Sequence, residues 1–272
     1  MSKDSMNGSS KYVLITGACG GMGSRTVKEF KQNGYKVFAL DKTACEKEEN
    51  VFPIAADITS EQSVKQAMKE VSGITDELYA IIHFAGIYML DSLAEMDSAA
   101  FEKIFRVNLF GAFLVNKTFM PLLKPGSRIL VTTSELAPLD PLPFTGIYAV
   151  TKASLDRYAY SLRMELQLLE ISVSVLRAGA VRTDMLAVSE SALDSFCKNT
   201  KLYSCNAKRF KRIVDSVEAK SIPPERIAEK ARCIIEKRNP GFAYSINRNP
   251  LLRLLNMLPR RLQLRIIRAV LK

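Results

Sequence analysis

Short apolar runs alternate along the chain with longer segments in which apolar residues recur with helical spacing. The runs predict buried strands at 12–16, 36–40, 52–56, 78–85, 127–133, 171–177 and 242–245. The periodic segments predict a helix that ends near Gln32 and further helices at 60–71, 98–123, 146–170 and 224–237. This alternation is typical of βαβ units around a parallel sheet. We therefore expect an α/β fold, a doubly wound Rossmann-type parallel sheet of about seven strands flanked by helices.

The two ends of the chain differ in composition from this central pattern. Residues 1–10 are small and polar, lack the apolar core of a signal peptide, and predict a disordered tail. Residues 11–248 predict one Rossmann-type domain, and 249–272 form an amphipathic C-terminal extension. Within the domain, 182–221 mixes Ser, Lys and Cys, so we expect a mobile flap there rather than core. No apolar stretch reaches the roughly 18 residues that a membrane-spanning helix needs.

The positive charge is concentrated in the extension. The formal net charge is +11, and leaving out residues 249–272, which hold six basic residues and no acid, lowers it to +5. A nucleic-acid surface would combine a basic stripe with stacking aromatic side chains, and this segment has no aromatic residue. We therefore expect no nucleic-acid partner.

The cysteine and histidine usage argues against a metal site. Five cysteines lie at positions 19, 45, 197, 205 and 233 without CxxC spacing, and His83 is the one histidine. A zinc site needs about four ligands at closer spacing. An odd number of scattered cysteines is typical of a reducing compartment, so we expect a cytoplasmic protein.

A glycine-rich motif follows the first predicted strand. The motif TGACGGMG places Gly17, Gly21 and Gly23 where glycine permits a tight turn and lets a pyrophosphate approach the helix N-terminus. Asp41 ends the second strand, 24 positions after Gly17. A carboxylate there binds the ribose hydroxyls of NAD and repels the 2′-phosphate of NADP. Lys42 and Arg25 weaken this discrimination, and we expect NAD rather than NADP. The alternatives are a flexible loop and an aspartate that forms a turn.

A second motif, Tyr148-Ala-Val-Thr-Lys152, lies in a predicted helix. Positions four apart share one helix face, so the phenol and the ammonium point the same way. Free tyrosine, with a pKa of about 10, is a poor base at neutral pH, and a neighbouring ammonium lowers that pKa. Such a phenol serves as both proton donor and proton acceptor. Taken alone, the spacing also fits a half-buried tyrosine beside a solvated lysine.

The glycine motif, the Tyr148/Lys152 pair and Ser134, fourteen residues before Tyr148, together resemble the short-chain dehydrogenase/reductase family over about residues 11–245. By this resemblance Tyr148 is the catalytic acid/base, Lys152 lowers its pKa and holds the nicotinamide ribose, and Ser134 hydrogen-bonds the substrate oxygen. Asn108 resembles the helix asparagine that supports a proton-relay water in the family. The structural alternatives are that Ser134 caps a loop and that Asn108 is a satisfied polar group in an apolar helix.

The resemblance also implies further cofactor contacts. Asp57 and Ile58 match the residues that bind adenine, and the loop RAGAVRT has Ala178 in place of the family's proline, which leaves that loop less rigid. HFAG stands where the family has NNAG, so His83 replaces an asparagine and is expected to have a structural role. The expected cofactor-binding residues are Gly17, Cys19, Gly21, Met22, Gly23, Asp41, Asp57, Ile58, Ala85, Gly86, Tyr148, Lys152, Val181 and Thr183.

The extension predicts an amphipathic helix that is interrupted at Pro259. Its apolar residues form a helical stripe, and Arg261, Arg265, Arg268 and Lys272 lie on the neighbouring face. Such a helix binds at a membrane interface, with its arginines against anionic lipid. The alternative is that the stripe packs on the domain, on a partner subunit or over the substrate cleft.

Together these features predict an NAD(H)-dependent oxidoreductase that interconverts a secondary alcohol and its ketone. The apolar, basic extension resembles those of hydroxysteroid and retinol dehydrogenase branches of the family, which implies an apolar substrate and a role in steroid or other lipid metabolism. We expect a homo-oligomer in the cytoplasm, with peripheral membrane contact through 250–272. Two alternatives from other classes are a cofactor-sensing protein that has lost turnover and a membrane-associated scaffold.

Overall fold

A computed structural model describes residues 11–218 and 221–272, so the predicted tail at 1–10 lies outside the described residues. Its centre is a seven-stranded sheet in the order β3-β2-β1-β4-β5-β6-β7, and every neighbouring pair is parallel. The strands are β1 (Tyr12–Thr16), β2 (Lys36–Asp41), β3 (Val51–Ala55), β4 (Leu78–His83), β5 (Leu123–Ser134), β6 (Ser172–Ala178) and β7 (Ala243–Ile246). The order changes direction between β1 and β4, which is the doubly wound arrangement. The predicted fold class is confirmed.

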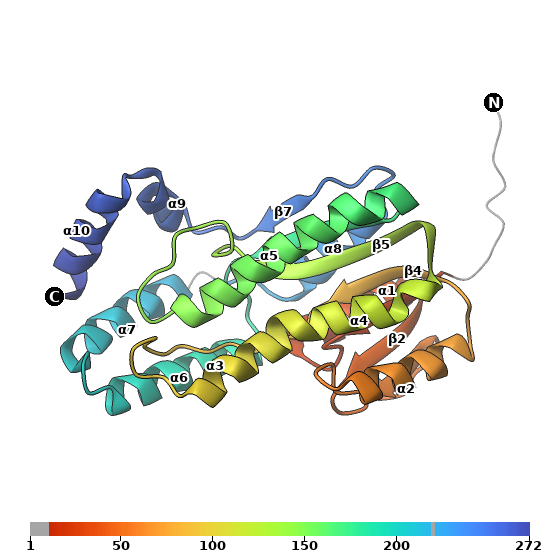
Figure 1. Ribbon diagram of the computed structural model, residues 1–272, viewed down its shortest axis with the longest axis horizontal. Helices are drawn as coiled ribbons and strands as arrows, with labels where there is room; N and C mark the ends of the chain where they lie inside the picture. Colours follow the sequence, from red (N-terminus) through yellow and green to blue (C-terminus); the bar gives the residue numbers. More distant parts are fainter. Residues whose placement is uncertain (1–10, 219–220) are drawn as a thin grey trace.

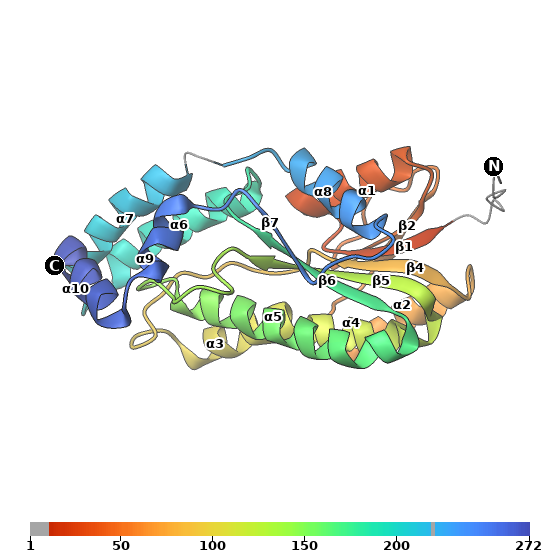
Figure 2. The same ribbon diagram turned by 90° about the horizontal axis from the view of Figure 1, so that it is seen from above.

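Helices cover both faces of this sheet, as Figure 2 shows from above. One face carries α1 (Gly21–Gln32) and α8 (Glu225–Ile235), and the other carries α2 (Glu61–Ser72), α4 (Gly111–Phe119) and α5 (Gly146–Leu166). Successive strand residues point to opposite faces, so in β1 Leu14 packs toward α2, α4 and α5, whereas Val13 and Ile15 pack toward α1 and α8. Because both faces are buried, the strands read as nearly continuous apolar runs.

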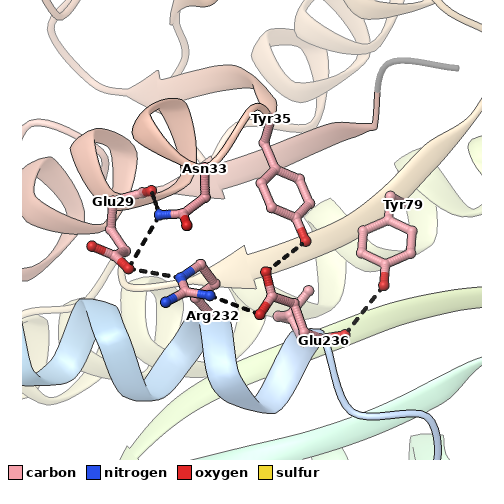
Figure 3. Close-up of polar contacts among 7 residues, drawn as sticks. Glu29, Asn33, Tyr35, Tyr79, Arg232 and Glu236 are labelled. Atoms are coloured by element: carbon pink, nitrogen blue, oxygen red, sulfur yellow. Dashed lines mark hydrogen bonds and ion pairs between the residues drawn. The ribbon is translucent and has the colours of Figure 1, made fainter. Parts of the chain in front are cut away.

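A polar network ties α8 to α1 over the sheet (Figure 3). Arg232 Nε donates to Glu29 Oε1 at 2.7 Å, and Arg232 Nη1 donates to Glu236 Oε2 at 2.8 Å. The Tyr35 hydroxyl donates to Glu236 Oε1 at 3.2 Å, and the Tyr79 hydroxyl donates to a backbone carbonyl at the end of α8 at 3.4 Å. Burial, followed by the nearby Glu236 carboxylate, raises the pKa of Tyr35. The network therefore keeps Tyr35 as a neutral hydrogen-bond donor.

The expectation of one continuous helix at 98–123 is wrong. The structure divides this stretch into α3 (Ser98–Phe105), a π-helical segment η1 (Arg106–Phe110), α4, and a 3₁₀ turn η2 (Met120–Leu122) that leads directly into β5. Short π-helical segments inside α-helices are rare and often occur at functional sites. Here the segment contains Asn108, which is buried.

The expectation that 182–221 contributes no core is also wrong. This segment forms α6 (Asp184–Asn199) and α7 (Ser204–Glu218), with 219–220 outside the described residues. Phe196, Tyr203 and Phe210 pack around Phe144, with ring centroids between 4.7 and 5.4 Å from its ring. The signal was an aromatic residue in each of two amphipathic helices, Phe196 and Phe210, with Tyr203 in the connection between them.

The C-terminal extension folds as two short helices, α9 (Pro250–Met257) and α10 (Arg260–Leu271), and the predicted interruption at Pro259 is confirmed. Both helices lie with α6 and α7 at the end of the molecule toward which the strands point (Figures 1 and 2). Asn206 Nδ2 of α7 donates to the Leu271 carbonyl of α10 at 2.7 Å. Among the described residues, no helix is long and apolar enough to cross a membrane.

Candidate active site

Two adjoining cavities lie at the carboxyl ends of the strands, where ligands bind in open α/β sheets. The larger has a volume of about 990 Å³ and the smaller about 240 Å³. Six residues line both cavities, namely Met22, Phe84, Gly86, Ile87, Tyr88 and Thr183. A molecule that fills the larger cavity therefore reaches the smaller one.

The glycine turn forms the floor of the larger cavity and has no room for side chains. Gly17 has a φ of +68°, and a Cβ there would lie 2.5 Å from the Ala85 nitrogen. A Cβ on Gly23 would lie 2.0 Å from the Gly17 carbonyl oxygen, and one on Gly21 would lie 2.7 Å from the Thr183 side chain. The turn leads directly into the N-terminus of α1, whose unpaired N–H groups suit a pyrophosphate. These features fit a dinucleotide cofactor.

Asp41 lies beside the glycine turn at the end of β2. Its Oδ2 accepts a hydrogen bond from the Cys19 backbone N–H at 2.9 Å, and its Oδ1 accepts one from the Lys42 backbone N–H at 2.7 Å. A disulfide joins Cys19 to Cys45, with 5.5 Å between their Cα atoms. The scattered cysteine spacing did not predict this bond. It links the glycine turn to the loop after β2, so both flanks of Asp41 are tied together.

Asp57 and Ile58 line the same cavity on the side of β3. Thr59 donates to Asp57 Oδ1 from its backbone N–H at 2.9 Å and from its hydroxyl at 2.7 Å, and Lys42 Nζ lies 3.3 Å from Asp57 Oδ2. The hydrogen bonds from Thr59, aided by Lys42, lower the pKa of Asp57. Ile58 packs so closely on Gly111 of α4 that a Cβ on that glycine would lie 2.6 Å from Ile58 Cδ1.

Ser134, Tyr148 and Lys152 converge on the smaller cavity. Ser134 is the last residue of β5, and the other two lie in the first two turns of α5. A hydrogen bond from Ser134 to Tyr148 favours the phenolate, and Ser134 Oγ accepts one from the Leu136 N–H at 3.2 Å. The Tyr88 ring stands 4.9 Å from the Tyr148 ring, centroid to centroid. The structure thus brings together the three residues for which the sequence predicted the chemistry.

A largely buried ion pair between Arg177 of β6 and Asp156 holds β6 against α5 near Ser134. Arg177 Nη2 lies 2.7 Å from Asp156 Oδ2, and Arg177 Nε donates to Asp156 Oδ1 at 2.9 Å. The Thr133 hydroxyl donates to the same Oδ1 at 3.2 Å. Because Asp156 lies one turn beyond Lys152 on α5, this contact sets the position of the helix that carries the tyrosine and lysine.

Lys152 does not act on the Tyr148 pKa as expected. Its Nζ lies 5.7 Å from the Tyr148 ring centroid and donates to the Thr132 carbonyl at 3.2 Å. Burial lowers the pKa of Lys152 to about 8. Burial, followed by the neighbouring Tyr88, raises the pKa of Tyr148, and the hydrogen bond from Ser134 opposes this only in part. The expectation of a lowered pKa for Tyr148 is therefore wrong in direction for this structure, because desolvation of the phenolate dominates.

Asn108 braces the loop after β4 and is not among the residues that line either cavity. Its Oδ1 accepts from the Ile87 N–H at 2.8 Å, and its Nδ2 donates to the Ile87 carbonyl at 3.0 Å and to Thr151 Oγ1 at 3.1 Å. A Cβ on Gly86 would lie 3.2 Å from Asn108 Oδ1. Asn108 therefore holds in place Ile87 and the Ala85–Gly86 pair, which line the larger cavity, and its relay role stays a prediction.

His83 has the structural role expected of it. Nε2 of the buried ring lies 2.8 Å from Asn116 Oδ1. Because an amide oxygen only accepts, Nε2 carries the hydrogen and donates it. Asn116 Nδ2 in turn donates to the Tyr158 hydroxyl at 3.2 Å. Burial lowers the pKa of His83 to about 4. The imidazole is neutral at pH 7 and links β4 to α4 and α5.

The loop after β6 is held without the family's proline. The Gly179 N–H donates to the Ile246 carbonyl at 3.0 Å, and Asn247 Nδ2 donates to the Ala180 carbonyl at 2.8 Å. Val181 forms a parallel bridge with Ile222. These contacts replace the rigidity that a proline at position 178 would supply. The loop delivers Thr183 to the wall shared by the two cavities.

Sequence reasoning missed the outer wall of the smaller cavity. This wall is formed by Phe210, Ile213 and Val214 of α7 and by Leu252 of α9. The apolar positions of α7 recur with helical spacing among four basic residues between 208 and 212, and that periodicity was the signal available. The wall makes the smaller cavity predominantly apolar.

Comparison with known proteins agrees with this geometry. The model of the short chain dehydrogenase family matches residues 11–194, so the chain belongs to this family. An uncharacterised oxidoreductase of Escherichia coli, YbbO, is 30% identical over 247 residues, which is 87% of this chain and 85% of that protein. Mouse estradiol 17-beta-dehydrogenase 2 is 31% identical over 208 residues, covering 70% of this chain and 55% of that protein.

A solved structure shares the fold. The 3-ketoacyl-(acyl-carrier-protein) reductase of Brucella melitensis, complexed with NADH, superposes with a TM-score of 0.71 at 22% identity, covering 87% of this chain and 96% of that one. Family membership and the cofactor-sized cleft together define an enzyme, an NAD(P)-dependent oxidoreductase of the short-chain dehydrogenase/reductase family.

Proposed function

We propose that this enzyme interconverts an apolar secondary alcohol and its ketone, with Tyr148 as the acid/base. The observation that carries the proposal is the convergence of Ser134, Tyr148 and Lys152 on one small cavity that adjoins the glycine cleft. Family membership alone leaves the substrate open, whereas the apolar wall contributed by α7 and α9 favours an apolar one.

The protonation states suit ketone reduction at neutral pH. Because burial raises the pKa of Tyr148, its phenol is protonated and donates to the carbonyl oxygen of a ketone. The hydrogen bond from Ser134 stabilises the phenolate that remains, and Ser134 lines the cavity in which the substrate oxygen would lie. The nicotinamide cofactor, when bound, supplies the hydride in reduction and accepts it in oxidation.

We propose NAD(H) as the preferred cofactor on the basis of Asp41. Its carboxylate stands beside the glycine turn at the end of β2, where it would bind ribose hydroxyls and repel a 2′-phosphate. The Lys42 ammonium would attract a 2′-phosphate and so favour NADP, but it is paired with Asp57. The residues that would hold the cofactor are those of the glycine turn, Asp41, Asp57, Ile58, the Ala85–Gly86 pair, Lys152 and Thr183.

A hydroxysteroid is the substrate class that we favour, and a retinoid, whose primary alcohol would give an aldehyde instead of a ketone, is the second. Tyr88, Leu142 and the α7 and α9 side chains line the smaller cavity with apolar surface. The mouse relative named as an estradiol dehydrogenase supports the same class, although this chain covers only 55% of that relative.

We further propose a homo-oligomer that contacts a membrane peripherally. The support for self-association is a set of exposed apolar side chains on α4 and α5, which cover one face of the sheet. These are Phe113, Val150, Tyr160 and Met164, each at least 39% exposed. Apolar side chains gathered on one face are typical of subunit interfaces.

The test is a turnover assay with purified protein and a panel of hydroxysteroids, retinol and short alcohols, read as NADH absorbance. We expect turnover of apolar secondary alcohols and of their ketones in reverse, and at least tenfold lower kcat/KM for short alcohols. Tight NADH binding without turnover of any compound would instead identify a cofactor-sensing protein.

A further inference from the structure

The C-terminal helices α9 and α10 have an inner face that fastens them to the domain. In α10, Gln263, Ile267 and Leu271 recur every four positions and turn inward, and Leu271 is only 8% exposed. Leu271 and Ile267 join the aromatic cluster of α6 and α7. The domain therefore covers one face of α10, and the other faces remain in contact with solvent.

Polar contacts fix α9 directly beside the active site. Glu135, the residue after Ser134, accepts a hydrogen bond from the Asn249 N–H at 2.6 Å. Asn249 Oδ1 caps α9 by accepting from the Leu251 and Leu252 N–H groups. Further along, Arg260 Nη2 lies 3.1 Å from Asp140 Oδ1, which secures the turn between the two helices.

The outer face of these helices is apolar and open to solvent. On α9, Leu251, Leu254 and Met257 are spaced by three, and their exposed fractions run from 59% to 81%. On α10, Leu262, Ile266 and Val270 are spaced by four and are 37% to 51% exposed. Large apolar side chains that line up on one exposed face mark an interaction surface.

Basic side chains border this apolar face and no acid interrupts them. Arg261, Arg265, Arg268 and Lys272 follow one side of α10, next to the stripe of Leu262, Ile266 and Val270. Of the six basic residues between 249 and 272, only Arg260 forms an ion pair among the described residues. The adjoining segment 201–214, which includes the start of α7, adds five basic residues and no acid, although Lys211 is paired with Asp194 of α6.

We propose that this surface, the outer faces of α9 and α10, docks on an anionic lipid bilayer. The leucines enter the interface between headgroups and acyl chains, and the arginines meet lipid phosphates. A second copy of the chain fits less well, because a symmetric contact would set one arginine row against the other with no acid to compensate.

The docking surface and the smaller cavity share helix α9, and α7 forms the rest of the cavity's outer wall. Leu252 of α9 lines the cavity, while its neighbour Leu251 faces outward. Ile213 of α7 lines the cavity and is also 36% exposed. An apolar substrate dissolved in the bilayer therefore reaches the cavity between α7 and α9 without crossing water. This last step rests on the proposed reaction and substrate class, whereas the docking itself does not.

The experiment is co-sedimentation of the full chain with phosphatidylcholine vesicles, with and without phosphatidylglycerol, at low and high salt. We expect binding to the anionic vesicles that high salt weakens, since salt screens the arginines and leaves the leucines. Leu251→Ser/Leu254→Ser/Met257→Ser and, separately, Arg261→Gln/Arg265→Gln/Arg268→Gln should each lower the bound fraction at least tenfold. The matched control is Leu168→Ser/Leu169→Ser, which removes exposed leucines in the 3₁₀ turn that follows the C-terminal end of α5.

Two results would overturn the proposal. One is equal, negligible sedimentation of wild type and all variants. The other is a wild-type dimer that the leucine variant converts to monomer, with no vesicle binding, which would make the surface a subunit interface. NADH turnover of a water-soluble ketone, measured beside sedimentation, tests the docking separately from the proposed function. We expect the docking variants to keep wild-type turnover. A chain that binds vesicles but turns over no substrate would refute only the substrate assignment.

Discussion

Lys152 Nζ donates to the Thr132 carbonyl and lies 5.7 Å from the Tyr148 ring centroid, so the two residues share a helix face without a direct polar bond between them. Burial lowers the pKa of Lys152 to about 8 and raises that of Tyr148. The tyrosine therefore stays protonated over the working pH range. The charge that changes near neutral pH belongs to the lysine.

The charge on Lys152 should determine the pH profile of ketone reduction. Below pH 8 Lys152 carries its positive charge, and as pH rises through about 8 that charge is lost. We expect kcat/KM, which reports on the free enzyme, to be flat below pH 8 and to fall above it with a single ionisation. Lys152→Met should give a low, flat profile. A wild-type profile that stays level to pH 10 would contradict the assignment.

Replacing Tyr148 by phenylalanine tests the proton donor. The ring and its packing on Tyr88 remain while the hydroxyl is lost, so we expect cofactor binding to persist and kcat to fall by about 10²–10⁴-fold. Tyr160→Phe, an exposed tyrosine on the same helix, is the matched control and should keep wild-type kcat. If Tyr148→Phe retains more than a tenth of wild-type kcat, with chemistry rate-limiting, another group donates the proton.

His83 makes the fold sensitive to acid. Its folded-state pKa of about 4 lies below the ordinary value of 6.5, so the unfolded chain takes up a proton first as pH falls. The free energy of unfolding is therefore independent of His83 titration above pH 6.5. It falls by up to about 3 kcal/mol as the pH drops from 6.5 to 4. Urea unfolding at pH 7 and pH 4.5 should show a smaller loss for His83→Asn than for wild type. Equal losses would refute the argument.

The strands were predictable because most of them are buried on both faces and therefore read as apolar runs. β1 matches the predicted 12–16 without change, and the other strands shift by a few residues at their ends. Helix breaks are harder to predict. The residues of η1, RVNLF, continue the apolar spacing of the flanking helices, so nothing local marks the π-helical turn at Asn108.

The candidate site was predictable as far as linear motifs reach. The glycine turn, Asp41 and the Ser134/Tyr148/Lys152 set each have a fixed spacing, and the structure brings them to two adjoining cavities. Contacts between distant segments have no such signal. The wall formed by α7 and α9, the Cys19–Cys45 bond and the burial that outweighs Lys152 at the Tyr148 phenol all depend on packing.

Substitutions at Asp41 and Lys42 should shift the cofactor preference in opposite directions. We expect a wild-type kcat/KM ratio for NADH over NADPH above one. Asp41→Asn should lower this ratio, because it removes the repelling charge while its side-chain oxygen still accepts from the Cys19 N–H. Lys42→Ala should raise it by removing a cation from the same cavity. A wild-type ratio below one would exclude the NAD preference before any variant is made.

The Cys19–Cys45 bond should stabilise both the fold and the cofactor cleft. It closes a segment with a sequence separation of 26, and a cross-link of that size contributes about 3 kcal/mol by restricting the unfolded chain. Since it also ties the glycine turn to the loop that follows Asp41, its loss should weaken NADH binding severalfold as the turn samples other conformations.

Disulfides are rare in reducing compartments, so the comparison is between oxidised and reduced protein. We expect reductant to lower the urea midpoint and the NADH affinity of wild type, and to have no effect on Cys45→Ser, which should behave like reduced wild type. Cys233→Ser, which removes an exposed free cysteine, is the control and should respond to reductant as wild type does. If reductant leaves both the midpoint and the affinity of wild type unchanged, the bond has no part in shaping the cleft.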